Sequence, residues 1–236
     1  MNTNRIEPAD TRSMGIVHSA LRRDLRRARM VLEAPPYPDE PRRRALAAHI
    51  LWMCLFLHMH HAGEDAGLWP AIRAKDPAAG ALLDRMASDH QQIGGAIAGV
   101  EDGARAYGDD PSARERLLAA LTGLEDVLLP HLRREELEMM PVVATTITTA
   151  EYRTIEKKYF VEPKGFAELG MEAHWIIDGV TPEDRDTIVH VVPAVPRFLL
   201  LHGFARKYRR QAAVLWGTSP ASTVPSLRVA PIEEHS

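Results

Sequence analysis

The chain repeats one pattern of histidine, glutamate and proline in its two halves, and this repeat limits the fold more than any other feature. The segment HHAGEDAGLWP in the first half has the same internal spacing as HLRREELEMMP in the second, and a lone histidine precedes each at nearly the same distance. The repeated residues are His18, His60, Glu64 and Pro70, then His90, His131, Glu135 and Pro141. Two equivalent halves predict two equivalent helical hairpins.

Prolines and capping residues divide the chain into helices. The pairs Asp76-Pro77 and Asp110-Pro111 mark helix starts, because an aspartate side chain caps the first turn and proline fits within it. Apolar residues recur at helical period between such marks, and strand signals are scarce. The predicted helices cover residues 11–33, 41–72, 77–107 and 111–140. Their short connections predict an all-α, antiparallel up-down four-helix bundle.

The chain changes character after the second repeat. Capping patterns at Thr148 with Glu151 and at Thr181 with Asp184 predict short helices, and a last helix is expected over residues 196–215. Prolines and serines follow it. We expect three parts: a metal-binding bundle over residues 1–143, a helical extension packed on it over residues 144–216, and a flexible tail over residues 217–236.

Composition excludes several classes of protein. The chain is 45% hydrophobic and 26% charged, which is typical of a globular protein, and its net charge of −3 gives no footprint for nucleic acid. The single cysteine, Cys54, excludes a disulfide framework and a cysteine-rich metal site. The first residues lack the apolar run of a signal peptide, and prolines interrupt residues 188–204. We therefore expect a cytoplasmic protein with no membrane or nucleic-acid partner.

The repeated histidines and glutamates have the spacing of metal ligands. An interval of four residues brings His60 and Glu64 to one helix face, and likewise His131 and Glu135. Four imidazoles and two carboxylates buried together need a cation, since unpaired they would be costly to desolvate. Two metals that share the glutamates keep open positions, and the symmetry of the halves favours this arrangement. The predicted metal ligands are His18, His60, Glu64, His90, His131 and Glu135.

Residues beside these ligands are expected to support them. His58 and His61 flank His60 and are expected to point away from it by helical geometry. His61, one position on, stays open as an additional ligand or as a hydrogen-bond donor to the ligands. Asp65 and Glu136 are expected to be solvated or to accept hydrogen bonds from ligand imidazoles.

These motifs resemble the hemerythrin-like, HHE cation-binding family over residues 11–143, and the later region resembles the C-terminal helical extension of its longer bacterial members. The resemblance implies two iron ions with an oxo or hydroxo bridge, bridged also by both glutamates and bound terminally by the four histidines. It implies binding of dioxygen, nitric oxide or peroxide. The oxygen carriers of the family have a second histidine four residues after the one that corresponds to His90, where this chain has Gly94. One iron is therefore expected to lose an imidazole, which makes reversible oxygen carriage less favoured.

The expected function is redox or stress handling of a small inorganic ligand: dioxygen, nitric oxide or hydrogen peroxide. Peroxidase-like, catalase-like or oxidase activity stays open. The alternative is a non-catalytic iron or oxygen sensor that acts through the C-terminal helices, and a structural zinc protein is a third hypothesis.

Other polar groups are expected to have no role in the site. The arginine run of residues 22–29 is interpreted as a solvated helix face, and His174, His190 and His202 as ordinary core or surface residues. Trp175, Ile176 and Ile177 are expected to pack the extension against the bundle or against a second subunit of a homodimer.

Overall fold

The chain is all-helical, as predicted. The computed structural model describes residues 8–192, 194–217 and 219–228. No strand occurs in these ranges, where extended pairing is limited to an isolated bridge between Pro8 and Thr148. The all-α class is therefore confirmed.

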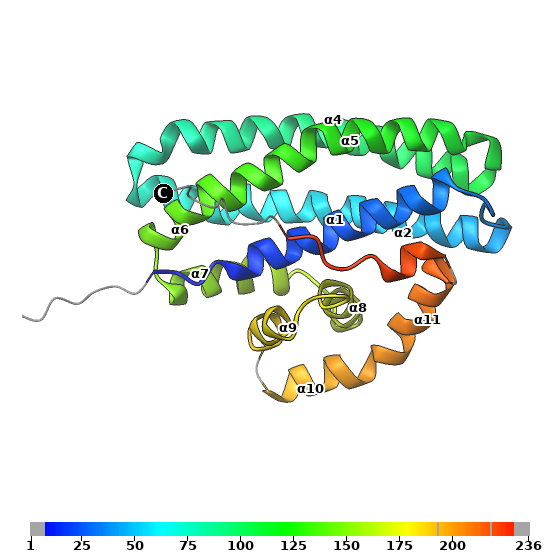
Figure 1. Cartoon of the computed structure of the whole chain (residues 1–236). Coiled ribbons are helices and arrows are strands. Elements are labelled where there is room, and N and C mark those ends of the chain that lie inside the picture. The colour runs from blue at the N-terminus through cyan, green and yellow to red at the C-terminus, as the bar shows by residue number, and fades with distance from the viewer. Residues whose placement is uncertain (1–7, 193, 218, 229–236) are drawn as a thin grey trace, which may run out of the picture.

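The long helices lie alongside one another and enclose the main hydrophobic core (Figure 1). They are α1 (Arg12–Glu33), α2 (Glu40–Gly63), α4 (Gly80–Asp109) and α5 (Arg114–Arg134). Helix α4 packs against both α2 and α5, and α1 contacts α5 and α2. Each helix thus turns one apolar face toward a shared interior, as the apolar periodicity predicts.

The two predicted Asp-Pro helix starts are confirmed. The Asp76 carboxylate accepts a hydrogen bond from the backbone N–H of Ala78 at 3.1 Å, and Asp110 accepts one from Ser112 at 2.8 Å. Each proline opens a short 3₁₀ turn, η2 (Pro77–Ala79) or η3 (Pro111–Ala113), that leads into α4 or α5. The side-chain acceptor satisfies a donor that the first helical turn leaves unpaired.

A widened π turn interrupts both glutamate-bearing helices at equivalent positions. The turn η1 (Glu64–Leu68) joins α2 to α3 (Trp69–Lys75), and η4 (Glu135–Met139) joins α5 to α6 (Met140–Thr146). In each, the N–H of the residue just before the repeated proline donates to the carbonyl of the glutamate five residues back. Proline lacks an N–H and clashes with the carbonyl four residues back, so the wider turn accommodates it. The sequence repeat is therefore also a repeat of backbone geometry.

The extension consists of short helices below α1 and α2 (Figure 1). They are α7 (Thr149–Glu156), η5 (Lys157–Val161), α8 (Phe166–Ile176), α9 (Pro182–Val189), α10 (Ala194–Gly203) and α11 (Ala205–Trp216). The capping box at Thr148 and the cap at Thr181 are present, as predicted. Helix α8 was not predicted, and the expected last helix divides at Phe204, whose ring lies against Gly170 of α8.

A buried carboxylate holds the extension onto the bundle. Asp24 of α1 accepts hydrogen bonds from His49 at 2.7 Å, from the Trp175 indole at 2.8 Å and from Arg23 at 2.8 Å. Arg23 also donates to the backbone carbonyls of Trp175 and Asp178. Trp175 thus packs the extension against the bundle, which is one of the two alternatives stated above; the other was packing against a second subunit.

The arginine run is only partly a solvated face. Arg23 is fully buried and Arg27 is 3% exposed, so the interpretation as a solvated face is wrong for both. Arg27 donates to the Asp178 carboxylate and to the Val224 carbonyl. These side chains face inward because α8, α9 and η6 cover the side of α1 that would otherwise meet solvent.

The tail also returns to the bundle. Residues 219–228 include the short turn η6 (Pro220–Thr223), which contacts α1. The Ser226 hydroxyl is 2.6 Å from that of Ser19, and Arg228 pairs with Asp184. The expectation of a flexible tail therefore does not hold for residues 219–228, whereas residues 229–236 lie outside the described ranges.

One continuous helical run, Glu40–Lys75, is long and apolar enough by length and composition to cross a membrane. Of its most apolar window, 56% is buried inside the protein. Packing of α2 against α4 and α1 accounts for this apolar character, because a core helix passes the same test.

Replacement of Asp24 by asparagine is expected to loosen the extension. The change leaves Arg23 buried without its charged partner, and breaking such a buried pair costs about 3 kcal/mol of unfolding free energy. Urea denaturation of the metal-free protein measures the loss. Asp126→Asn, an exposed change on α5, is the matched control and should leave stability within about 0.5 kcal/mol. Equal stability of the two variants would contradict this account.

Candidate metal centre

The predicted ligands lie together inside the bundle, in two adjoining groups. His18, His60, Glu64 and Glu135 form one group, and His61, His90 and His131 form the other. In each group, the nitrogen or oxygen atoms that could bind a metal lie within 4.8 Å of one another. All seven residues are buried. We call these seven residues the buried cluster.

The first group joins the beginning of α1 to the end of α2. The Nε2 atoms of His18 and His60 are 3.3 Å apart. His60 Nε2 lies 3.0 Å from Glu64 Oε1, and His18 Nε2 lies 3.4 Å from Glu135 Oε2. Two imidazole nitrogens and carboxylate oxygens from both repeats therefore converge on one point.

The second group joins α2 to α4 and α5. The His61 and His90 rings stack with centroids 4.1 Å apart, and His131 meets His90 edge-on at 4.8 Å. Glu64 Oε2 is 3.4 Å from His90 Nε2, and Glu135 Oε2 is 3.6 Å from His131 Nε2. Each glutamate therefore lies close to imidazoles of both groups.

His61 belongs to the buried cluster, which the sequence left undecided. It lies beside His90, on the side where Gly94 provides no imidazole, so that group holds three imidazoles and the first holds two. Neighbouring residues of a helix point about 100° apart. Since α2 contacts both α1 and α4, His60 faces His18 while His61 faces His90. Phe56 and Leu57, one turn earlier in α2, are also adjacent in sequence and both buried. Such pairs of adjacent apolar residues are the sequence signal that α2 has a wide buried face.

Carboxylates outside the buried cluster orient three of its imidazoles. His18 Nδ1 lies 2.9 Å from Glu136, and His90 Nδ1 lies 2.9 Å from Asp65, as expected. His131 Nδ1 lies 3.3 Å from Asp89, which sequence reasoning missed although it directly precedes His90. A carboxylate that accepts the Nδ1 proton leaves Nε2 free to face the interior as a ligand.

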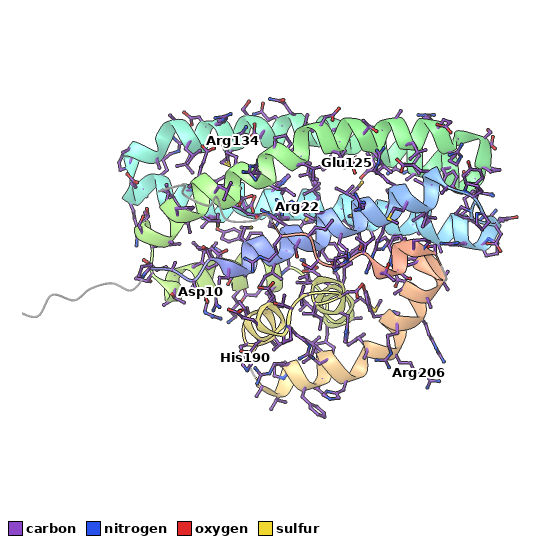
Figure 2. The ribbon with its side chains drawn as sticks, in the orientation of Figure 1. Asp10, Arg22, Glu125, Arg134, His190 and Arg206 are labelled. Carbon is purple, nitrogen blue, oxygen red and sulfur yellow. The ribbon has the colours of Figure 1, made fainter. Side chains whose placement is uncertain are left out.

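Arginines in turn hold two of these outer carboxylates. Arg22 of α1 pairs with Glu136 at 2.8 Å, and Arg134 of α5 pairs with Asp89. Figure 2 shows Arg22 on α1 and Arg134 on α5. Each series of contacts thus runs from an arginine through a carboxylate to an imidazole of the buried cluster.

Ligand atoms of the buried cluster lack hydrogen-bond partners among the described residues. They are both carboxylate oxygens of Glu64 and of Glu135, and the Nε2 atoms of His61, His90 and His131. Buried polar atoms without partners are rare and cost free energy, so each calls for an explanation. Bound cations satisfy all of these atoms together, and the residues present therefore fit a metal centre.

Burial also sets the protonation of these residues. It lowers the pKa of His60 to about 3 and the pKa of His131 to about 2, so both imidazoles are neutral at physiological pH. It raises the pKa of Glu64 and Glu135 well above the ordinary value. The metal-free interior thus favours uncharged side chains, and neutral imidazole is the form that binds a metal.

Among the described residues, His174, His190 and His202 do not form a second metal site. His174 contacts the Leu201 carbonyl and stacks on Tyr208. His190 and His202 each contact a carbonyl four residues back in their own helix. Figure 2 places His190 beside α9, away from the bundle. His58 is exposed on α2, as expected.

Comparisons with known proteins give one informative result. The family model described as hemerythrin, hemerythrin HHE cation binding domain, matches residues 11–143. Neither the curated proteins nor the solved structures give a match. The matched range includes every residue of the buried cluster and ends before the extension.

Replacement of Glu135 by leucine is expected to stabilise the metal-free protein. The change removes a buried carboxylate without hydrogen-bond partners, whose burial costs about 1–3 kcal/mol. The same variant should lose the rise in melting temperature that a divalent metal gives the original protein. Urea and thermal unfolding with and without Fe²⁺ measure both effects.

Glu138→Leu is the control for this experiment, because Glu138 is exposed in the same turn. It should keep the stabilisation by metal. If Glu135→Leu instead weakened the metal-free protein and kept the full response to metal, Glu135 would not be a ligand.

Proposed function

The chain belongs to the hemerythrin HHE cation-binding domain family, and on this premise we propose that the buried cluster holds two iron ions. The observation that carries the proposal is the set of buried ligand atoms without partners, shared between two adjoining groups. His18 and His60 would bind one ion, and His61, His90 and His131 the other. Glu64 and Glu135 reach both groups and would bridge the ions.

We propose that α1, α2, α4 and α5 form the antiparallel up-down bundle of this family. The connections between α4 and α5 and between α3, which continues α2, and α4 are short, which supports a reversal of chain direction at each. In this arrangement the two His-x-x-x-Glu segments come from helices of equivalent position in the two hairpins.

The proposed function is binding of, or reaction with, dioxygen, nitric oxide or hydrogen peroxide. A pair of iron ions, when bound, supplies reversible electron transfer and open positions for such ligands. The residues of the chain hold the imidazoles in one tautomer, exclude water and provide neutral ligands. The group of His18 and His60 has fewer imidazoles, so we place the open position on that side.

His61 lies beside His90 and supplies an imidazole on the side where Gly94 supplies none. The buried cluster therefore has five imidazoles, and the expectation that one ion lacks an imidazole is not kept in this proposal. The argument from a missing imidazole against reversible oxygen carriage no longer applies, so the proposal includes reversible binding of dioxygen as well as reaction with it.

A sensor is the second candidate function, because the extension touches a proposed ligand. The Phe160 ring lies 5.7 Å from the His60 ring, and its edge would be 2.7 Å from a Cβ added at Gly63. This close contact offers a direct route from the metal state to the C-terminal helices. A change of protease sensitivity in residues 144–228 between ferrous and ferric protein, with no turnover of peroxide, would favour the sensor.

Iron content tests the proposed stoichiometry. The original protein is expected to hold about two iron ions per chain and to show near-ultraviolet absorption when oxidised. His61→Ala should reduce the content toward about one, since its group loses one of three imidazoles. His58→Ala, exposed on the same helix, is the control and should keep full content. Full content in both variants would remove His61 from the ligand set.

Ligand chemistry tests the function itself. Iron-loaded protein is expected to consume peroxide or to bind nitric oxide or azide with a change in its visible spectrum. His60→Ala should abolish these reactions by removing a ligand on the open side. A fully loaded protein that reacts with none of the three would contradict the proposal, and a colourless zinc form that alone is stable would favour the structural alternative.

A further inference from the structure

An apolar cavity lies between the bundle and the extension. It has a volume of about 350 Å³, which is in the range of small-molecule sites. Side chains of α1, α2, α7, α8, α9 and α10 line it, and most of them are aliphatic or aromatic. Figure 1 shows these helices of the extension grouped below α1. Leu169, Ile176 and Leu200 are among the lining residues, and Phe56 lies on the bundle side.

The inner wall of the cavity includes His60 but no other residue of the buried cluster. Phe56 stacks on the His60 ring with ring centroids 6.0 Å apart, and the tilted Phe160 ring lies 5.7 Å from the His60 ring. The cavity is therefore separate from the metal centre and adjoins one of its proposed ligands. A molecule within it would contact the side of the His60 ring and not the ligand atoms of Glu64 or Glu135.

Apart from Arg197, the charged groups of the extension that line the cavity already have partners. Lys164 pairs with Glu172 through both carboxylate oxygens at 2.7 and 2.6 Å. Glu156 accepts a hydrogen bond from the Ser13 hydroxyl at 2.6 Å. None of these groups offers a free cation to a ligand, so this part of the cavity favours an uncharged, apolar group.

Arg197 of α10 differs from these residues. It lines the cavity and is half-buried, yet it forms no hydrogen bond or ion pair with any residue in ranges 8–192, 194–217 and 219–228. An arginine guanidinium binds a carboxylate through two parallel hydrogen bonds. The cavity thus combines an apolar interior with one cation that has no described partner.

We propose that this cavity binds a medium-chain aliphatic carboxylate. Its hydrocarbon chain lies among the apolar side chains of α8, α9 and α10 and ends near Phe56 and His60, and its carboxylate pairs with Arg197. The proposal does not rest on the metal centre. The molecule would contact the side of the His60 ring, and no other residue of the buried cluster lines the cavity. It can therefore fail or succeed apart from the proposed function.

The first test is calorimetric titration of the full chain, without metal, with hexanoate, octanoate and decanoate below their micellar concentrations. Burial of each added methylene is expected to tighten binding by roughly fourfold. Decanol, with the same chain and no charge, should bind roughly tenfold more weakly than decanoate. The absence of measurable binding by all four compounds would overturn the proposal.

Paired variants locate the head group. Arg197→Gln should weaken decanoate binding by roughly tenfold and leave decanol binding unchanged. Arg206→Gln is the control, because Arg206 is exposed on α11 and points away from the cavity (Figure 2). If decanol bound as tightly as decanoate, or Arg197→Gln had no effect, the carboxylate would not be the recognised group and the proposal would be wrong.

A second pair locates the chain. Ala173→Phe on α8 places a ring in the cavity and should abolish binding, whereas Ala167→Phe, exposed on the same helix, should not. Urea unfolding of each variant identifies one that fails to fold. In that case Leu200→Ala, which enlarges the cavity, serves instead and should shift the preference toward longer chains. Unchanged binding in a folded Ala173→Phe variant would place the ligand elsewhere.

Discussion

The cost of burying two carboxylates among five imidazoles is the constraint on which the rest of this structure depends. Glu64 and Glu135 are fully buried, and their oxygens find no donor in the described chain. Such groups are costly without a partner, so the fold must recover the free energy elsewhere or from bound cations. The outer chains from Arg22 through Glu136 and from Arg134 through Asp89 hold the imidazoles in position while the inner atoms stay unpaired. The metal-free site is thus held ready by residues that do not themselves bind metal.

Sequence reasoning reached the residues whose placement is set by local geometry. The interval of four between His131 and Glu135 determines a shared helix face, and the aspartates before prolines determine helix starts. It did not decide His61 or find Asp89, because their roles depend on which helices lie beside α2 and α5. The burial of Arg23 was missed for a similar reason: it depends on a segment some 150 residues away that covers α1. The π turns also escaped prediction, since proline within a helical pattern predicts only a break or a kink.

The extension is more than a cover for the bundle. Trp175 of the extension donates a hydrogen bond to Asp24 of the bundle, and the Phe160 ring packs against Gly63. Together these contacts bring apolar side chains of the extension close to His60. The family match ends at residue 143, so this arrangement belongs to the part of the chain that the match does not describe.

The duplicated π turns separate two apolar regions. Upstream of them, residues such as Leu57 and Leu128 belong to the main core, whereas downstream Trp69 and Val143 belong to a second hydrophobic cluster with the beginning of α4. A π turn is equivalent to an α-helix with one residue inserted, so it offsets the helical phase of the two parts. The offset keeps the apolar residues on both sides of the turn in inward-facing positions, Leu57 and Leu128 in the main core and Trp69 and Val143 in the second cluster. One inserted residue thus lets the same helix serve two hydrophobic clusters, with the buried cluster where they meet.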